Sequence, residues 1–192
     1  MMKYYFVILF MFTTISVTAQ DENKVELPYY EVPEYSKDYT AGTMAARMVD
    51  ALGFRFYWSS EGLNEKDLAY QPSEGVRSTA ETIDHILDLS YVIVNSTLKK
   101  PNGKVDKTEM TFEDKRKQAL FNLKTAADLL RKSDDISQFK IIFGENEIPF
   151  WNLVNGPIAD AIWHCGQLAS FRRNSGNPIN PNVNHFSGKI KE

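Results

Sequence analysis

Four stretches of the chain place apolar residues three and four positions apart, the spacing that aligns them on one face of an α-helix. In the first of these, Met44, Met48, Leu52 and Phe56 recur with a period near 3.6 residues. Gly62 and the polar residues after it interrupt the pattern. The pattern therefore predicts a helix over residues 41–60.

The second stretch starts at a recognisable helix-capping signal. Ser78 is followed three residues later by Glu81, the form of a capping box. A wide apolar stripe follows: Ala80, Ile83, Leu87, Tyr91, Val94 and Leu98. Lys99 and Lys100 suit the negative end of the helix dipole. We predict a helix over residues 79–99.

Two further helices are predicted in the second half of the chain. Thr111 and Asp114 mark the start of one, which runs to about residue 133. The last ends at Ser175, with Gly176 as its C-cap. Pro157 is either the first residue of this helix or a kink in a longer helix that starts near Phe150.

The segment before the last helix has a different pattern. The run 139–143 is too short and too rich in β-branched residues to predict a helix. A turn at 144–146 would pair it with Ile148 and Phe150 in a β-hairpin. Together these patterns predict an all-α fold, a four-helix bundle over residues 41–178 with a short β-hairpin before the last helix. An extended lead-in at 20–40 and an irregular tail at 179–192 flank it.

The first nineteen residues differ from the rest of the chain. Lys3 precedes a strongly apolar run that closes on small residues up to Ala19, the layout of a secretory signal peptide. A membrane anchor is the alternative, although the apolar run is short for a span. We expect residues 1–19 to be removed and the mature protein to be exported, periplasmic or secreted, without a membrane segment.

Charge and cysteine content narrow the function classes. The formal net charge is −3 and no Lys/Arg-rich run stands out, which argues against a nucleic-acid partner. Cys165 is the only cysteine, so the domain has no internal disulfide and depends on its core. We interpret Cys165 as a core residue, with a nucleophile or metal ligand as alternatives.

The candidate chemistry lies in the sequence DAIWHCGQ, residues 160–167. Asp160 and His164 are four residues apart and, with Gln167, share one face of the last helix. Because their neighbours are apolar, we expect the carboxylate to be buried and to need a partner. A metal ion would serve, since both groups are common ligands.

A third ligand would come from another helix. His85, in the second predicted helix, is the better candidate, and His185 in the tail is a weaker one. His85, Asp160 and His164 would form a two-histidine, one-carboxylate set suited to a divalent transition metal such as Zn, Ni or Fe. The alternative is a structural Asp–His pair in the core, with His85 on the surface.

These residues carry a resemblance to a known family. The histidine in ETIDHILDL and the last-helix sequence ADAIWHCGQLASFRRNSGNP are similar to the DinB-like superfamily of metal-binding four-helix bundles, over residues 43–178. The family typically has one histidine on the second helix and two, four apart, on the last. His85 and His164 match two of these positions, and Asp160 stands where the family has its other histidine.

The resemblance implies a function class. Members of this family with known activity look like metal-dependent thiol transferases, isomerases or hydrolases, and the resemblance implies one of these activities here. Small thiol cofactors belong to the cytosol, so a thiol transferase is less expected for an exported protein. We therefore expect a metal-dependent hydrolase, in which metal-activated water acts on a small-molecule substrate, before a transferase. The alternative function is a non-catalytic bundle that binds a ligand or partner, and a homodimer is left open.

Several other residues are candidates for roles near the site. A pocket at the end of the bundle could be lined by Tyr57, Trp58 and Glu61, or these residues could simply pack in or around the core. Glu81 either accepts a hydrogen bond from His85 or caps its helix. Trp163 is expected to pack beside the site. Arg172 and Arg173 are expected to be surface partners of a helix C-terminus, with substrate anchors as the alternative.

Overall fold

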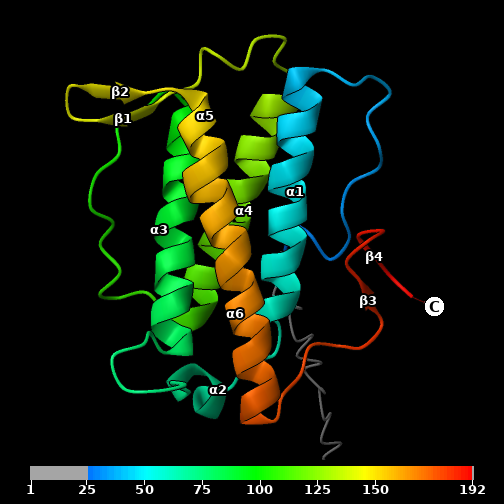
Figure 1. Cartoon of the computed structure of the whole chain (residues 1–192), viewed down its shortest axis with the longest axis vertical. Coiled ribbons are helices and arrows are strands. Elements are labelled where there is room, and N and C mark those ends of the chain that lie inside the picture. The colour runs from blue at the N-terminus through cyan, green and yellow to red at the C-terminus, as the bar shows by residue number, and fades with distance from the viewer. Residues whose placement is uncertain (1–25, 192) are drawn as a thin grey trace, which may run out of the picture.

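The computed structural model describes residues 26–191. The predicted signal peptide, residues 1–19, and the start of the lead-in lie outside this part of the chain. Within it the protein is mostly helical, with two small antiparallel strand pairs (Figure 1). The mostly helical expectation is confirmed.

The first three predicted helices form where the sequence placed them. Helix α1 spans Ala41–Ser60 and begins at a capping box on Thr40. Helix α3 spans Thr79–Thr97 from the predicted Ser78–Glu81 capping box, and ends two residues early. Helix α4 spans Phe112–Arg131 from a capping box at Thr111. Each cap satisfies backbone N–H groups that have no partner inside the helix.

The last helix is longer and less regular. It begins as α5, Phe150–Leu153, passes through a π-helical segment, Val154–Ile158, and continues as α6, Ala159–Ser175. Pro157 lies inside the π-helical segment, so it interrupts a longer helix rather than starting one. Proline lacks an N–H and crowds the preceding turn, and such an irregular turn accommodates it. Gly176, with φ of 93°, ends the helix as predicted.

The predicted hairpin is present with Ile148 in its second strand, but Phe150, also predicted there, is instead the first residue of α5. Strands β1, Ile141–Phe143, and β2, Asn146–Ile148, pair antiparallel. Gly144 in the turn has φ of 58°, a left-handed conformation that glycine adopts without strain.

Two elements were not predicted. A short helix, α2, spans Glu65–Ala69 in the polar segment that follows Gly62. The tail contains a second hairpin of β3, Val183–Asn184, and β4, Lys189–Ile190. Both are too short for a periodic apolar pattern to reveal them. The tail is therefore more ordered than the predicted irregular segment.

The four long helices lie side by side around one core (Figure 1). Helices α1 and α3 each pack against both α4 and α6. Their predicted apolar faces are buried, and the fully buried side chains include Leu52, Ile86, Leu87, Leu123 and Leu168. Helix α3 thereby contacts both α6 and the π-helical segment that precedes it.

The lead-in is extended, as predicted, and part of it is packed. The Tyr29 ring lies over Gly53 of α1 so closely that a Cβ there would come within 2.4 Å of it. Val32 is buried with Phe54 and Trp58. Among the helices of residues 26–191, none combines the length and apolar character needed to cross a bilayer.

Candidate metal centre

His85 occupies the second turn of α3, where the Ser78 cap has fixed the helix start. It is half-buried and faces α6, and its Nε2 atom lies 3.1 Å from Oδ2 of Asp160. Asp84 and Asp88, on either side of it in the sequence, have separate partners. Their carboxylates lie 2.8 Å from Lys115 Nζ and 2.7 Å from Lys107 Nζ.

Asp160 and His164 occupy successive turns of α6 on the face toward α3. His164 Nε2 lies 3.3 Å from Oδ1 of Asp160, as the four-residue spacing predicted. The His85 and His164 rings meet edge to face, with centroids 4.7 Å apart. The carboxylate therefore lies between two imidazoles from different helices.

The three side chains lie close enough to hold a metal ion. Each offers one ligand atom, and these atoms all lie within 4.8 Å of one another. Nitrogen and carboxylate ligands bound to one Zn²⁺ at about 2.0–2.2 Å would be roughly 3.3 Å apart in a tetrahedral site. The two imidazole–carboxylate separations, 3.1 Å to Oδ2 and 3.3 Å to Oδ1, are of that size but run to different oxygens of Asp160.

Gln167 orients His164 from the next turn of the helix. Its Oε1 atom lies 2.7 Å from His164 Nδ1. Since an amide oxygen only accepts, this contact favours the tautomer of His164 with its proton on Nδ1. In the neutral ring Nε2 then presents a lone pair to the Asp160 carboxylate, the arrangement of a histidine that binds a metal.

The expectation that Asp160 is buried is wrong. Its side chain is 44% exposed, whereas the His164 side chain is 8% exposed. The neighbouring apolar residue Trp163 is also exposed, at 71%. The apolar composition of this segment did not predict its exposure, because apolar side chains are common on protein surfaces. Asp160 therefore connects a buried histidine to solvent.

The other candidates near the site have structural roles. Glu81 accepts a hydrogen bond from the Ser78 backbone N–H and caps α3. Tyr57 and Glu61 both contact Arg116, through a cation–π contact and an ion pair. Trp58 is buried and donates to the Tyr30 carbonyl oxygen.

Trp163, predicted to pack beside the site, is exposed instead. Arg172, predicted at the surface, is buried and donates hydrogen bonds to the carbonyl oxygens of Trp58 and Asn177. Arg173 is exposed, as expected.

Cys165 and His185 are not part of the cluster. Cys165 is 3% exposed, and burial raises the pKa of its thiol to about 12. It is therefore a core residue, as interpreted, and not an activated thiol. The His185 ring packs edge-on against Phe54, with a centroid distance of 5.8 Å.

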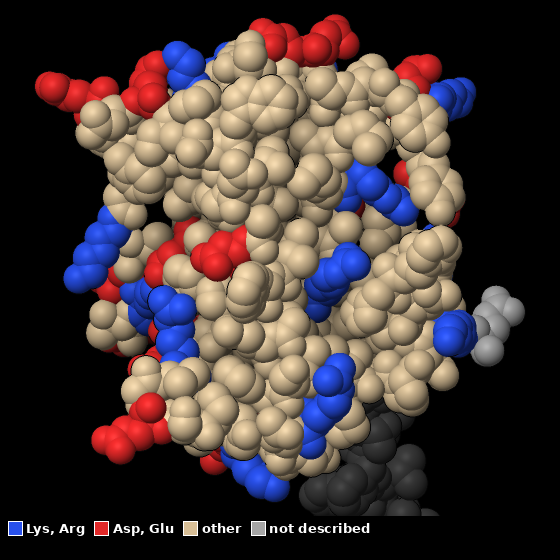
Figure 2. All heavy atoms as spheres, in the orientation of Figure 1, with Lys and Arg blue, Asp and Glu red and all other residues tan. Residues whose placement is uncertain are grey.

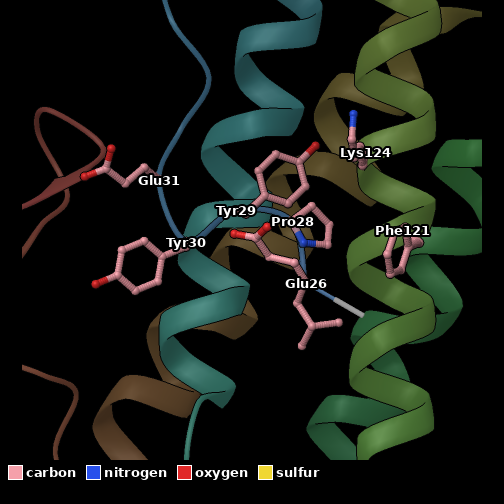
Figure 3. A pocket seen from close by; sticks show the side chains of 8 residues that line it. Glu26, Pro28, Tyr29, Tyr30, Glu31, Phe121 and Lys124 are labelled. Atoms are coloured by element: carbon pink, nitrogen blue, oxygen red, sulfur yellow. The ribbon is translucent and has the colours of Figure 1, made fainter. Parts of the chain in front are cut away.

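A prominent hollow lies away from the three residues. It has a volume of about 560 Å³ and is lined by residues 26–31 of the lead-in with Phe121 and Lys124 of α4 (Figure 3). This places it beside α1 and α4, whereas the cluster joins α3 and α6. Its wall begins at Glu26, the first residue that the structure describes, and it does not contribute to the candidate site.

No family model matches the chain, and no curated protein matches it. The fold and site define it as a mostly helical protein whose described residues include one His–Asp–His cluster able to hold a metal ion.

Proposed function

We propose that this chain is an exported, DinB-like four-helix bundle that binds one divalent transition metal through His85, Asp160 and His164. The metal would be Zn²⁺, Ni²⁺ or Fe²⁺, which accept imidazole nitrogen and carboxylate oxygen together. The resemblance in residues 43–178 and the packing of α1, α3, α4 and α6 support the assignment to this fold.

One observation carries the proposal: ligand atoms from two helices, 75 residues apart in sequence, lie within 4.8 Å of one another. The hydrogen-bonding state of His164 adds support. When the His164 proton is on Nδ1, the lone pair of Nε2 points at the lone pairs of the Asp160 carboxylate. A cation between them, or a second proton on the ring, relieves that repulsion.

The proposed activity is hydrolysis of a small molecule. A bound metal of this kind activates a water molecule for attack at neutral pH. The half-exposed Asp160 leaves one side of the cluster open to solvent and substrate. His85 and His164 would supply nitrogen ligands, Asp160 an oxygen ligand, and Gln167 would hold the His164 ring in place.

A non-catalytic bundle with a structural Asp–His cluster is the second candidate. It is favoured by the observation that each carboxylate oxygen of Asp160 already lies within 3.3 Å of an imidazole nitrogen. Such a cluster would connect α3 to α6 without an ion, if His164 carried two protons.

Metal analysis distinguishes the two functions. The wild-type protein, purified without chelator, is expected to contain close to one equivalent of transition metal per chain. His85→Ala, Asp160→Ala and His164→Ala are expected to lose it, whereas the matched control His185→Ala retains it. Wild-type protein that stays metal-free when offered Zn²⁺, Ni²⁺ and Fe²⁺ would contradict the metal-binding proposal and favour the structural cluster.

A further inference from the structure

A second hollow lies on the other side of α6 from the His–Asp–His cluster. It has a volume of about 390 Å³ and joins three parts of the fold, with walls from Arg55 and Ser59 of α1, Ile162 and Gly166 of α6, and Ile179 and His185 of the tail. Gly166 follows His164 by two residues, which is about 200° around the helix. The hollow is therefore separate from the candidate metal centre.

The hollow carries one fixed positive charge. Arg55 and His185 both line it, and none of its described lining residues is acidic. The guanidinium of Arg55 donates one hydrogen bond to the Ala51 carbonyl oxygen, at 3.0 Å, and forms no ion pair within residues 26–191. Partial enclosure, and then the nearby charge of Arg55, lower the pKa of His185. A lowered pKa favours the neutral imidazole, so the positive charge of the hollow comes from Arg55, which has no acidic partner in the described chain, and His185 adds a neutral hydrogen-bonding group.

The surrounding surface has the same sign. Figure 2 shows basic side chains along the strip between α6 and the C-terminal segment. The acidic side chains of this face gather mainly toward its upper and left parts. An anion approaching the strip would meet an attractive field, even though the net charge of the protein is −3.

The rest of the wall is apolar and leaves room for a ligand. Ile162 and Ile179 face the hollow from α6 and the tail. Gly166 lies in the interior of α6, where glycine costs about 1 kcal/mol relative to alanine. A Cβ at this position would meet no atom within 4 Å, so packing against the protein does not require glycine. Its effect is to keep the floor of the hollow open.

We propose that this hollow binds a small amphipathic carboxylate, with its anionic group on Arg55 and its apolar body against Ile162, Gly166 and Ile179. The volume is at the lower end of the range typical of small-molecule sites, about 300–1,000 Å³. A guanidinium matches the planar geometry of a carboxylate, and His185 at the rim adds a second donor. A polyphosphate would need more basic side chains than these two.

Octanoate is a suitable probe, with octanol and octylamine as matched compounds of the same chain length. Binding is measured by calorimetric titration of the full mature protein. Octanoate is expected to bind at one site, and octanol and octylamine at least about tenfold more weakly, because charged hydrogen bonds to Arg55 are lost.

Two variants test the location of the site. Arg55→Gln is expected to weaken octanoate binding about tenfold or more, with Arg77→Gln as an exposed control that does not change it. Gly166→Leu would fill the hollow and abolish binding without loss of thermal stability, since its side chain extends into open space. Equal binding of octanoate and octanol, or octanoate binding that survives both Arg55→Gln and Gly166→Leu, would overturn the proposal.

Metal content provides an independent reading. Both variants are expected to keep wild-type metal content, because neither residue belongs to the cluster. Loss of octanoate binding with metal retained would separate this site from the metal centre.

Discussion

At the scale of single residues, the contact between Gln167 and His164 decides which nitrogen faces Asp160. The amide oxygen holds the ring through Nδ1, and Nε2 is left directed at the carboxylate. A fixed ring orientation reduces the cost of arranging the ligands when a metal binds.

We therefore predict that Gln167→Ala weakens metal affinity about 10–100-fold, the usual effect of removing a hydrogen-bond partner of a ligating histidine. Gln167→Glu should preserve affinity, since a carboxylate also accepts from Nδ1–H. Competition titration with a chromophoric chelator measures both. Gln71→Ala, at an exposed position, serves as control, and unchanged affinity in Gln167→Ala would contradict the orienting role.

At the scale of elements, the short helix α2 attaches the loop after α1 to the end of α6. Its buried Asp67 accepts hydrogen bonds from Ser175 Oγ, at 2.6 Å, and Asn177 Nδ2, also at 2.6 Å. Lys66 donates to the Ser175 carbonyl oxygen, one of the last in α6. Burial raises the pKa of Asp67, but these bonds together with the Asn64 backbone N–H outweigh it and lower the pKa overall.

This shift predicts a pH dependence. A carboxylate whose pKa is lower in the folded state contributes stability above its ordinary pKa of 3.8, and this contribution is lost as the pH falls through the folded-state value. Asp67→Asn should lower the free energy of unfolding at neutral pH by about 1–3 kcal/mol. The deficit should shrink below pH 3.8.

Urea unfolding of wild type and variant across this pH range measures the difference. Asp134→Asn, at an exposed position, should leave the curve unchanged. A deficit in Asp67→Asn that is the same at all pH values would show that the carboxylate charge is not responsible.

At the scale of the whole molecule, the His–Asp–His cluster links two helices that are far apart in sequence. His85 comes from α3, whereas Asp160 and His164 come from α6. A ligand that binds only the assembled cluster stabilises the folded state by mass action. Metal binding and global stability are therefore coupled in the proposed function.

We predict that saturating metal raises the melting temperature of the wild-type protein and that a chelator reverses the rise. At a free metal concentration about 100 times Kd the gain is about 2.7 kcal/mol, or roughly 5–10 °C for a chain of this size. Differential scanning calorimetry of wild type and His164→Ala provides the test. The same metal-dependent rise in His164→Ala would place the ion elsewhere.

The sequence by itself determined the helices and the candidate ligands. Periodic apolar faces and capping residues act locally, so the start and type of α1, α3 and α4 followed from neighbours in the chain. The four-residue spacing likewise placed Asp160 and His164 together. The meeting of His85 with Asp160 was a hypothesis, because it depends on how two helices pack.

Only the tertiary structure decided burial and the short elements. Asp160 is half-exposed and Arg172 is buried because exposure depends on which helix or loop lies opposite, which local composition does not contain. Helix α2 and strands β3 and β4 are too short to produce a periodic signal. For the same reason the hollow between α1, α6 and the tail was invisible in the sequence: its walls come from three segments that only folding brings together.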